Sequence, residues 1–115
     1  MEQSEAVAAL GALAQDTRLQ LYRVLVARGP AGLAAGTIAE QLGIVPSSLS
    51  FHLSQLLHAG LIAQRRLGRQ IIYAAEYGAM NALLAYLSEN CCGRGTACIP
   101  MDGPVADPAE TTSAA

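Results

Sequence analysis

The segment from Thr37 to Gly60 constrains the fold most, because its pattern predicts two helices joined by a tight turn. Thr37–Leu42 places its apolar residues inward, and Gly43 is well placed to end that helix. Pro46 stands where a second helix begins, and leucines then recur at helical spacing. This buried stripe consists of Leu49, Leu53, Leu56 and Leu57. Two helices with a short glycine-containing turn form a helix-turn-helix.

Two further helices are predicted before this motif. Ser4–Gln15 repeats apolar residues at three- and four-residue spacing, and Asp16 or Thr17 can cap a following helix that ends at Gly29. The apolar residues of the first helix are Val7, Leu10, Leu13 and Ala14, and those of the second are Leu19, Leu21, Tyr22, Leu25 and Val26. Pro30–Gly36 reads as a loop with one short strand at Leu33.

A β-hairpin and a last helix are predicted after the motif. Leu61–Leu67 and Gln70–Ala74 flank Gly68, which is typical of a hairpin. The last helix, Tyr77–Asn90, has a stripe too apolar to face water alone, formed by Met80, Leu83, Leu84 and Leu87. We therefore expect a mainly α (α+β) fold of about five helices and a β-hairpin.

Length and composition favour one soluble domain. The 115 residues are near the size at which dimerisation helps, and no apolar run is long enough to cross a membrane. Because the N-terminus lacks an export signal, we expect a cytoplasmic protein. We expect residues 1–92 to form the folded domain and the proline-containing, aromatic-free residues 103–115 to be disordered.

The predicted helix-turn-helix and hairpin suit DNA. Although the net charge is −2, residues 41–75 contain three arginines and no acid, and without the acids after Pro100 the net charge would be +1. The helix from Pro46 presents an uncharged polar face that can contact bases or phosphates. The candidate DNA-binding residues are Ser47, Ser48, Ser50, Phe51, His52, Ser54, Gln55, Arg65, Arg66 and Arg69. The alternative is an ordinary solvated face with Ser47 or Ser48 as a cap.

The two histidines and the phenylalanine of this helix need separate interpretation. His52 lies toward the flank of the leucine stripe, so we expect a partly buried, hydrogen-bonded side chain rather than a ligand. His58, on the polar side, is expected to be solvated. Phe51 is the only phenylalanine and is predicted to be exposed, which is unfavourable unless it meets a thymine methyl, a sugar or a partner.

All three cysteines lie within eight residues after the last predicted helix: Cys91, Cys92 and Cys98. Thiolates select soft ions, and the two glycines between Cys92 and Cys98 let the chain turn back. Zinc usually takes four ligands and fits poorly, whereas three-coordinate arsenite or antimonite fits better. The alternatives are a disulfide or three unpaired thiols, although a bond between neighbouring cysteines is strained.

Several motifs in order resemble the ArsR/SmtB family of metal-responsive winged-helix repressors, from about Ala6 to Cys98. They are Leu13-Ala14-Gln15-Asp16-Thr17-Arg18-Leu19, Ile38-Ala39-Glu40-Gln41-Leu42-Gly43, Ser48-Leu49-Ser50-Phe51-His52-Leu53, Leu56-Leu57-His58-Ala59-Gly60-Leu61-Ile62 and Arg65-Arg66-Leu67-Gly68-Arg69. The resemblance implies a winged helix-turn-helix whose recognition helix enters the major groove of a palindromic operator. It also implies a homodimer through the first and last helices, with interface residues Val7, Leu10, Leu13, Met80, Leu83, Leu84 and Leu87.

The departures from the family pattern concern the inducer. Thr37–Gly43 has no cysteine pair and Tyr77–Asn90 has no Asp or His, so two common metal sites are absent. The cysteines of residues 91–98 look like those of the arsenic(III)-responsive subset, in which Cys91, Cys92 and Cys98 are the metal ligands.

The resulting hypothesis is an arsenite-responsive repressor, with antimonite as a possible inducer, that leaves operator DNA when the three thiolates bind the ion. A thiol redox or other heavy-metal sensor using the same cysteines is the first alternative. A protein interaction module that docks a partner on its last helix is the second. An enzyme is not expected, because no nucleophile, anion loop or acid–base pair appears.

Overall fold

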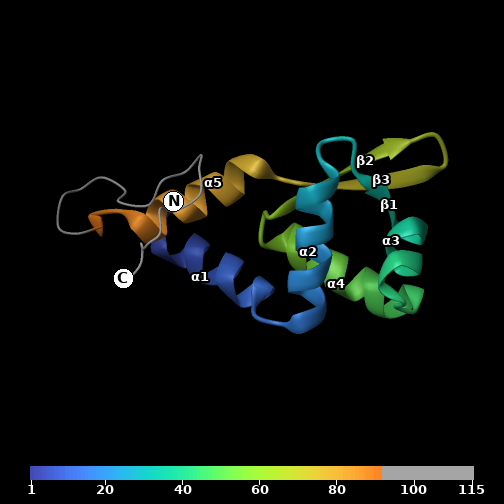
Figure 1. The fold of residues 1–115 in the computed structure, drawn as a ribbon, viewed down its shortest axis with the longest axis horizontal. Coiled ribbons are helices and arrows are strands. Elements are labelled where there is room, and N and C mark those ends of the chain that lie inside the picture. Colours follow the sequence, from blue (N-terminus) through green and yellow to red (C-terminus); the bar gives the residue numbers. More distant parts are fainter. Residues whose placement is uncertain (92–115) are drawn as a thin grey trace, which may run out of the picture. The chain divides into compact units, whose positions relative to one another are not determined.

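The computed structural model describes residues 1–91. By their internal contacts, residues up to Leu83 form one compact unit, and the described residues from Leu84 to Cys91 lie outside it. The described elements, drawn in Figure 1, are α1 (Gln3–Leu13), α2 (Asp16–Arg28), β1 (Leu33–Ala34), α3 (Ala35–Leu42), α4 (Pro46–His58), β2 (Ile62–Leu67), β3 (Gln70–Ala75) and α5 (Tyr77–Ser88). The predicted five helices and hairpin are confirmed.

The helix-turn-helix forms where the sequence predicted it. Gly43 ends α3 in the left-handed conformation with φ 66°, which a glycine adopts without a steric penalty. Pro46 occupies the first turn of α4, where its missing N–H costs nothing. Helix α3 begins at Ala35, two residues before the predicted Thr37, because extended Ala34 leads from β1 directly into the first turn.

The cap of α2 corrects one prediction. Neither Asp16 nor Thr17 caps this helix; the side chain of Gln15 accepts a hydrogen bond from the N–H of Arg18 at 2.8 Å. Extended backbone at Gln15 lets the longer side chain reach the first turn, so Asp16 becomes the first helical residue. Leu19 was also predicted to face the core, but it is 45% exposed because it lies on the outer side of α2.

The three strands form an antiparallel sheet in the order β1-β3-β2. Leu67 pairs with Gln70 across the hairpin turn, in which Gly68 has φ 64°. Gly32 brings the loop before β1 against β3: it has φ 72°, and a Cβ there would lie 2.5 Å from the carbonyl oxygen of Tyr73. Only glycine fits that approach.

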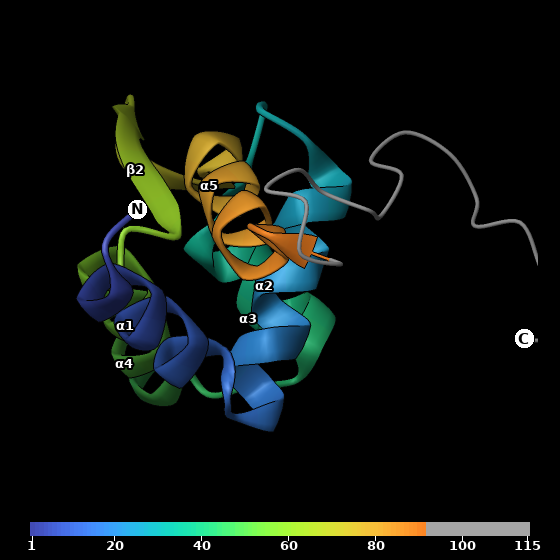
Figure 2. The same ribbon diagram turned by 90° about the vertical axis from the view of Figure 1, so that its left-hand side faces the viewer.

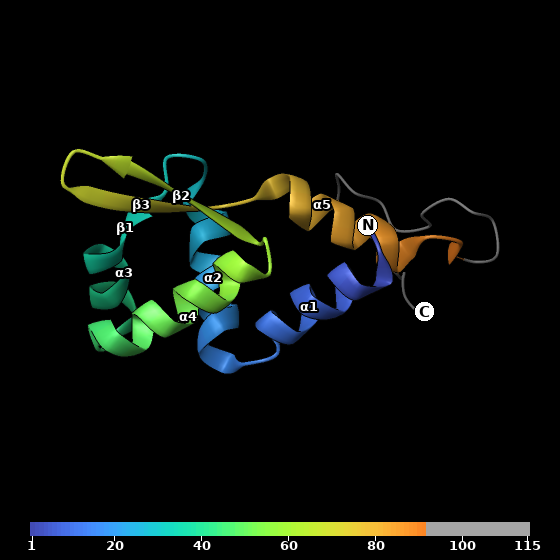
Figure 3. The same ribbon diagram turned by 180° about the vertical axis from the view of Figure 1, so that it is seen from behind.

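Large aliphatic residues from six of the elements and the loop after α4 fill the core of the first unit. Leu49, Leu53 and Leu56 of α4 are at most 3% exposed, which confirms three of the four predicted members of the stripe; Leu57 is half-buried. Figure 3 shows α4 crossing in front of α2, with α3 beside the N-terminal end of α4. The largest fully buried side chains are Leu21, Leu25, Ile38, Leu49, Leu56 and Leu61.

Helix α1 buries alanines. It packs against α2 and α4 (Figure 2), and its buried residues are Ala6, Ala9 and Ala12. Val7 is 60% exposed and Leu10 is 42% exposed. Val7 and Leu10 therefore face away from the core of their own unit.

Helix α5 ends at Ser88, before the predicted Asn90. The Ser88 hydroxyl donates to the carbonyl of Leu84 at 2.9 Å, and Asn90 has φ 61°, outside helical geometry. None of the described helices combines the length and hydropathy that a membrane span requires. Cys92, Cys98 and residues 103–115 lie outside the described residues.

Candidate nucleic-acid interface

The outer face of α4 exposes hydroxyl and amide groups. Its inner face is fixed by the buried leucines, and the helical period then turns the intervening residues outward. The exposed candidates on α4 are Ser47, Ser48, Ser50, Phe51, Ser54 and Gln55. A helix about 10–12 Å across fits the B-DNA major groove, where such side chains can bond to base edges.

The start of α4 favours a phosphate. Val45 precedes the helix in extended conformation and provides no side-chain cap, and the first turn contains no acidic residue. The first amides of a helix lack intrahelical acceptors and carry a partial positive charge. An anion near Ser47 and Ser48 would accept hydrogen bonds from these amides and would be attracted by the partial positive charge.

His52 is held within the protein, as expected from its position. It is half-buried, and its Nδ1 lies 3.2 Å from an Nη of Arg18. Partial burial, and secondarily the charge of Arg18, lower the pKa of His52 below its usual 6.5. The neutral ring therefore accepts from Arg18 at Nδ1.

Phe51 is 58% exposed, as predicted. Its ring meets the His52 ring edge to face, with centroids 5.8 Å apart and an interplanar angle of 63°. An exposed phenylalanine beside serines provides an apolar contact surface on an otherwise polar face.

The three arginines of the hairpin were all predicted to bind DNA, but they have different environments. The guanidinium of Arg65 donates to the carbonyl of Pro30 at 3.3 Å and to that of Ala31 at 3.0 Å. It thereby joins β2 to the loop before β1. Arg66 and Arg69 are exposed toward the hairpin turn and can reach a phosphate backbone.

Sequence reasoning gave no role to Arg18. Its Nε donates to the carbonyl of Ala12 at 2.7 Å, in addition to the contact of its Nη with His52. The available signal was its place in the Asp16-Thr17-Arg18 motif, but nothing in the sequence shows which helices a guanidinium joins.

The predicted dimer-interface residues fall into two groups. Val7, Leu10, Leu84 and Leu87 are large exposed apolar residues. Leu13 and Met80 are half-buried, and Leu83 is only 6% exposed. A second copy of the chain could therefore bury more apolar surface on the exposed group than on the other three residues.

The predicted metal site extends beyond the described residues. Cys91 is half-buried and follows α5, whereas Cys92 and Cys98 are not among residues 1–91. Within that described part, no three His, Cys, Asp or Glu side chains gather as a metal site.

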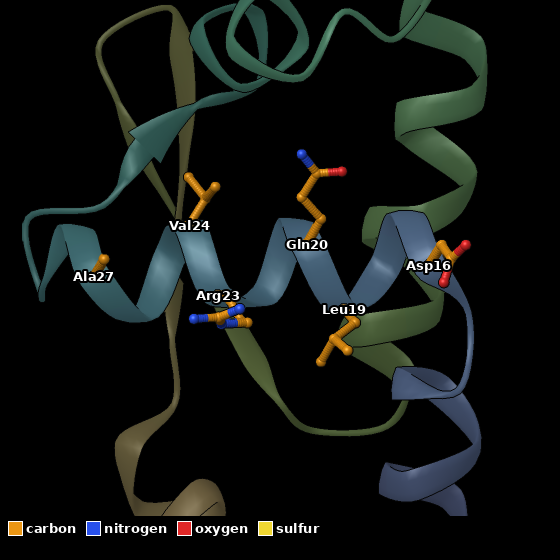
Figure 4. Close-up of a pocket in the computed structure, with 6 residues that line it drawn as sticks. All are labelled: Asp16, Leu19, Gln20, Arg23, Val24 and Ala27. Atoms are coloured by element: carbon orange, nitrogen blue, oxygen red, sulfur yellow. The ribbon is translucent and has the colours of Figure 1, made fainter.

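A shallow hollow of about 430 Å³ lies along α2. Figure 4 shows its lining side chains, which all come from that one helix: Asp16, Leu19, Gln20, Arg23, Val24 and Ala27. Binding sites usually combine convergent polar groups from several elements. This hollow is therefore a weaker candidate binding site than the surface formed by α4 and the hairpin.

Comparison with known proteins points to one class of protein. Residues 13–65 match the family described as "Helix-turn-helix domain". The HTH-type transcriptional regulator YgaV of Escherichia coli (strain K12) is 32% identical over 88 residues, covering 76% of this chain and 87% of YgaV.

Two solved structures have similar folds. The ArsR-like transcriptional regulator from Rhodococcus sp. RHA1 gives a TM-score of 0.67 at 26% identity, over 73% of this chain and 76% of that one. Mb0332 from Mycobacterium bovis, described as a homodimeric winged helix-turn-helix DNA-binding domain and a possible ArsR-family regulator, gives 0.62 at 26% identity, with coverages of 73% and 76%.

Proposed function

Because the chain belongs to the ArsR family of winged helix-turn-helix transcriptional regulators, we propose that it is an arsenite-responsive repressor. As a homodimer it binds a palindromic operator, and it is released when As(III) or Sb(III) binds Cys91, Cys92 and Cys98. The cytoplasm, where thiols stay reduced, suits this chemistry.

The observation that carries the DNA-binding part is the two-sided character of α4. Leu49, Leu53 and Leu56 lock one side into the core, so the opposite side is held rigidly and presents only neutral polar groups and Phe51. The exposed arginines of the hairpin, Arg66 and Arg69, supply the charge that α4 lacks. Base contacts then come from α4 and backbone contacts from the hairpin.

The homodimer is supported by the exposed apolar residues of α1 and α5. Val7, Leu10, Leu84 and Leu87 are 42–60% exposed, and a second copy would remove that surface from water. The similar Mb0332 domain is also described as homodimeric. Two recognition helices related by a two-fold axis require a palindromic operator.

The inducer part rests on the chemistry and position of the cysteines. Three thiolates within eight residues match the three-coordinate preference of As(III), and Cys91 lies three residues after the last residue of α5. Release requires that the loaded dimer prefer an arrangement different from the DNA-bound one. A coupling free energy of about 1–3 kcal/mol would weaken DNA binding roughly 5- to 150-fold.

DNA binding is tested by fluorescence anisotropy with a duplex selected from a random pool. Gln55→Ala should cost about 1–3 kcal/mol on the selected duplex, and Arg66→Ala should weaken binding to all duplexes and reduce the salt slope by about 1. Arg23→Ala, an exposed arginine on α2, is the matched control and should bind normally. Unchanged affinity in both test variants would rule out this placement of the DNA.

The inducer is tested by titrating the DNA-bound protein with As(III), Sb(III) and Zn(II). Cys91→Ser, Cys92→Ser and Cys98→Ser should each bind the operator normally and resist release by As(III). Normal release of all three variants rules out the three-thiolate site. Release by an oxidant but not by As(III) identifies a thiol redox sensor, whereas failure to select any duplex favours the interaction module.

A further inference from the structure

Arg18 joins three helices of the first unit through one side chain. It lies in the first turn of α2, its Nε donates to the Ala12 carbonyl near the end of α1 at 2.7 Å, and an Nη lies 3.2 Å from Nδ1 of His52 in α4. Both contacts are partly buried, where hydrogen bonds from a charged donor are stronger than on the surface.

The chemistry of the pair fixes the state of the histidine. A guanidinium is always protonated and only donates, so Nδ1 of His52 must be the acceptor and the ring proton must sit on Nε2. The planar fork of Arg18 serves both partners at once, which a single ammonium on a flexible stem does poorly. The ring of His52 is thus fixed in tautomer and orientation.

The fixed histidine in turn contacts the exposed phenylalanine. The edge-to-face arrangement at 5.8 Å leaves the Phe51 ring beside the serines of α4, where it remains 58% exposed. Covering an exposed Phe ring removes apolar surface from water and is therefore favourable. In the major groove the apolar group on a base edge is the 5-methyl group of thymine.

We propose that Arg18 is a positioning residue for DNA recognition: through His52 it holds the Phe51 ring in place to contact a thymine methyl group in each operator half-site. This inference rests on the proposed DNA binding and assigns it a base preference. Through Arg18 it also connects α1, whose outer residues are expected at the dimer interface, to α4 by hydrogen bonds.

The test uses the full chain and the tightest duplex selected from a random pool, with each thymine replaced in turn by deoxyuridine, which lacks only the methyl group. At one position in each half-site, replacing thymine by uracil should weaken wild-type binding about fourfold for each methyl group that is lost. Phe51→Ala should bind the thymine and uracil duplexes equally, and Phe51→Leu should keep part of the preference.

The positioning role is read from the same thymine-to-uracil affinity ratio. Arg18→Gln should bring this ratio close to 1, whereas Arg23→Gln, which removes the same charge from the same helix, should retain the wild-type ratio. His52→Ala breaks the link from its other end and should match Arg18→Gln. Far-UV circular dichroism checks that each variant is folded, and His52→Ala serves as the test if Arg18→Gln does not fold.

The outcomes separate this inference from the proposed function. If the wild type binds a selected duplex but no thymine position is sensitive to uracil, or if the half-sites contain no thymine, the methyl contact is wrong while DNA binding stands. If folded Arg18→Gln or His52→Ala keeps the wild-type ratio, the positioning role is wrong. If no duplex is selected at all, both fail.

Discussion

Helices α4 and α1 both repeat apolar residues at helical spacing, yet they bury different kinds of side chain. In α4 the leucines face the core, with Leu49, Leu53 and Leu56 at most 3% exposed. In α1 the core side consists of alanines, and Val7 and Leu10 face outward. A stripe of large apolar residues therefore identifies the core-facing side of α4 but not that of α1.

The physical reason is the space available between the helices. Alanine lets α1 approach α2 and α4 closely but removes little apolar surface from water, so burial stabilises α1 less than α4. The outward apolar residues of α1 gain their stabilisation only when another surface covers them. The comparison predicts that substitutions in α4 affect folding, whereas outward substitutions in α1 affect association.

The largest effect is expected for Leu56→Ala in α4. Leu56 is fully buried, so its truncation loses transfer free energy and leaves a cavity, at a cost of about 2–5 kcal/mol in unfolding free energy. Urea unfolding followed by far-UV circular dichroism measures this loss. A change below about 1 kcal/mol would mean that α4 is not anchored as described.

A smaller loss is expected for Ala9→Leu in α1. Ala9 is 1% exposed, and a larger side chain there must push α1 away from its neighbours, at a cost of about 1–3 kcal/mol. Ala8→Leu is the matched control, because Ala8 is exposed on the same helix. Equal stability of the two variants would contradict the alanine-mediated packing of α1.

Association rather than folding should change in Leu10→Ala. Leu10 is 42% exposed, so the unfolding free energy of the single chain should change by about 0.5 kcal/mol or less. The dissociation constant of the dimer should rise by about tenfold or more, because the lost side chain is buried in both copies. Sedimentation at several concentrations measures it; an unchanged dissociation constant would remove α1 from the interface.

The smallest effect is expected from the pH dependence of the link between α1 and α4. The pKa of His52 is below 6.5 in the folded chain, so the unfolded chain binds more protons between these two values. The contribution of neutral His52 to the unfolding free energy is therefore complete above about pH 6.5, and it is lost as the pH falls through the lowered pKa. His52→Asn keeps an acceptor for Arg18 without titrating, so its unfolding free energy should fall less than that of the wild type between pH 7.5 and 5. Parallel curves would contradict a lowered pKa.

Much of the fold follows from local patterns. Gly43 ends α3 and Pro46 starts α4 as predicted, because left-handed glycine and a proline in the first turn are local backbone effects. The cap of α2 was predicted wrongly, because Gln15 is an uncommon cap that depends on its extended backbone. Leu19 was assigned to the core wrongly, because periodicity does not reveal which leucines of a helix find a neighbour.

The succession of elements, the polar face of α4 and the basic hairpin can all be predicted from the residues alone, because helical period, turn residues and charge are properties of neighbouring positions. The partners of the individual side chains follow from the packed fold and not from local patterns. Arg65 binds backbone carbonyls 34 and 35 residues away, and Arg18 reaches His52 across 34 residues. Such contacts depend on the packing of segments that are distant in the sequence, so the residues next to an arginine do not reveal its hydrogen-bond partner.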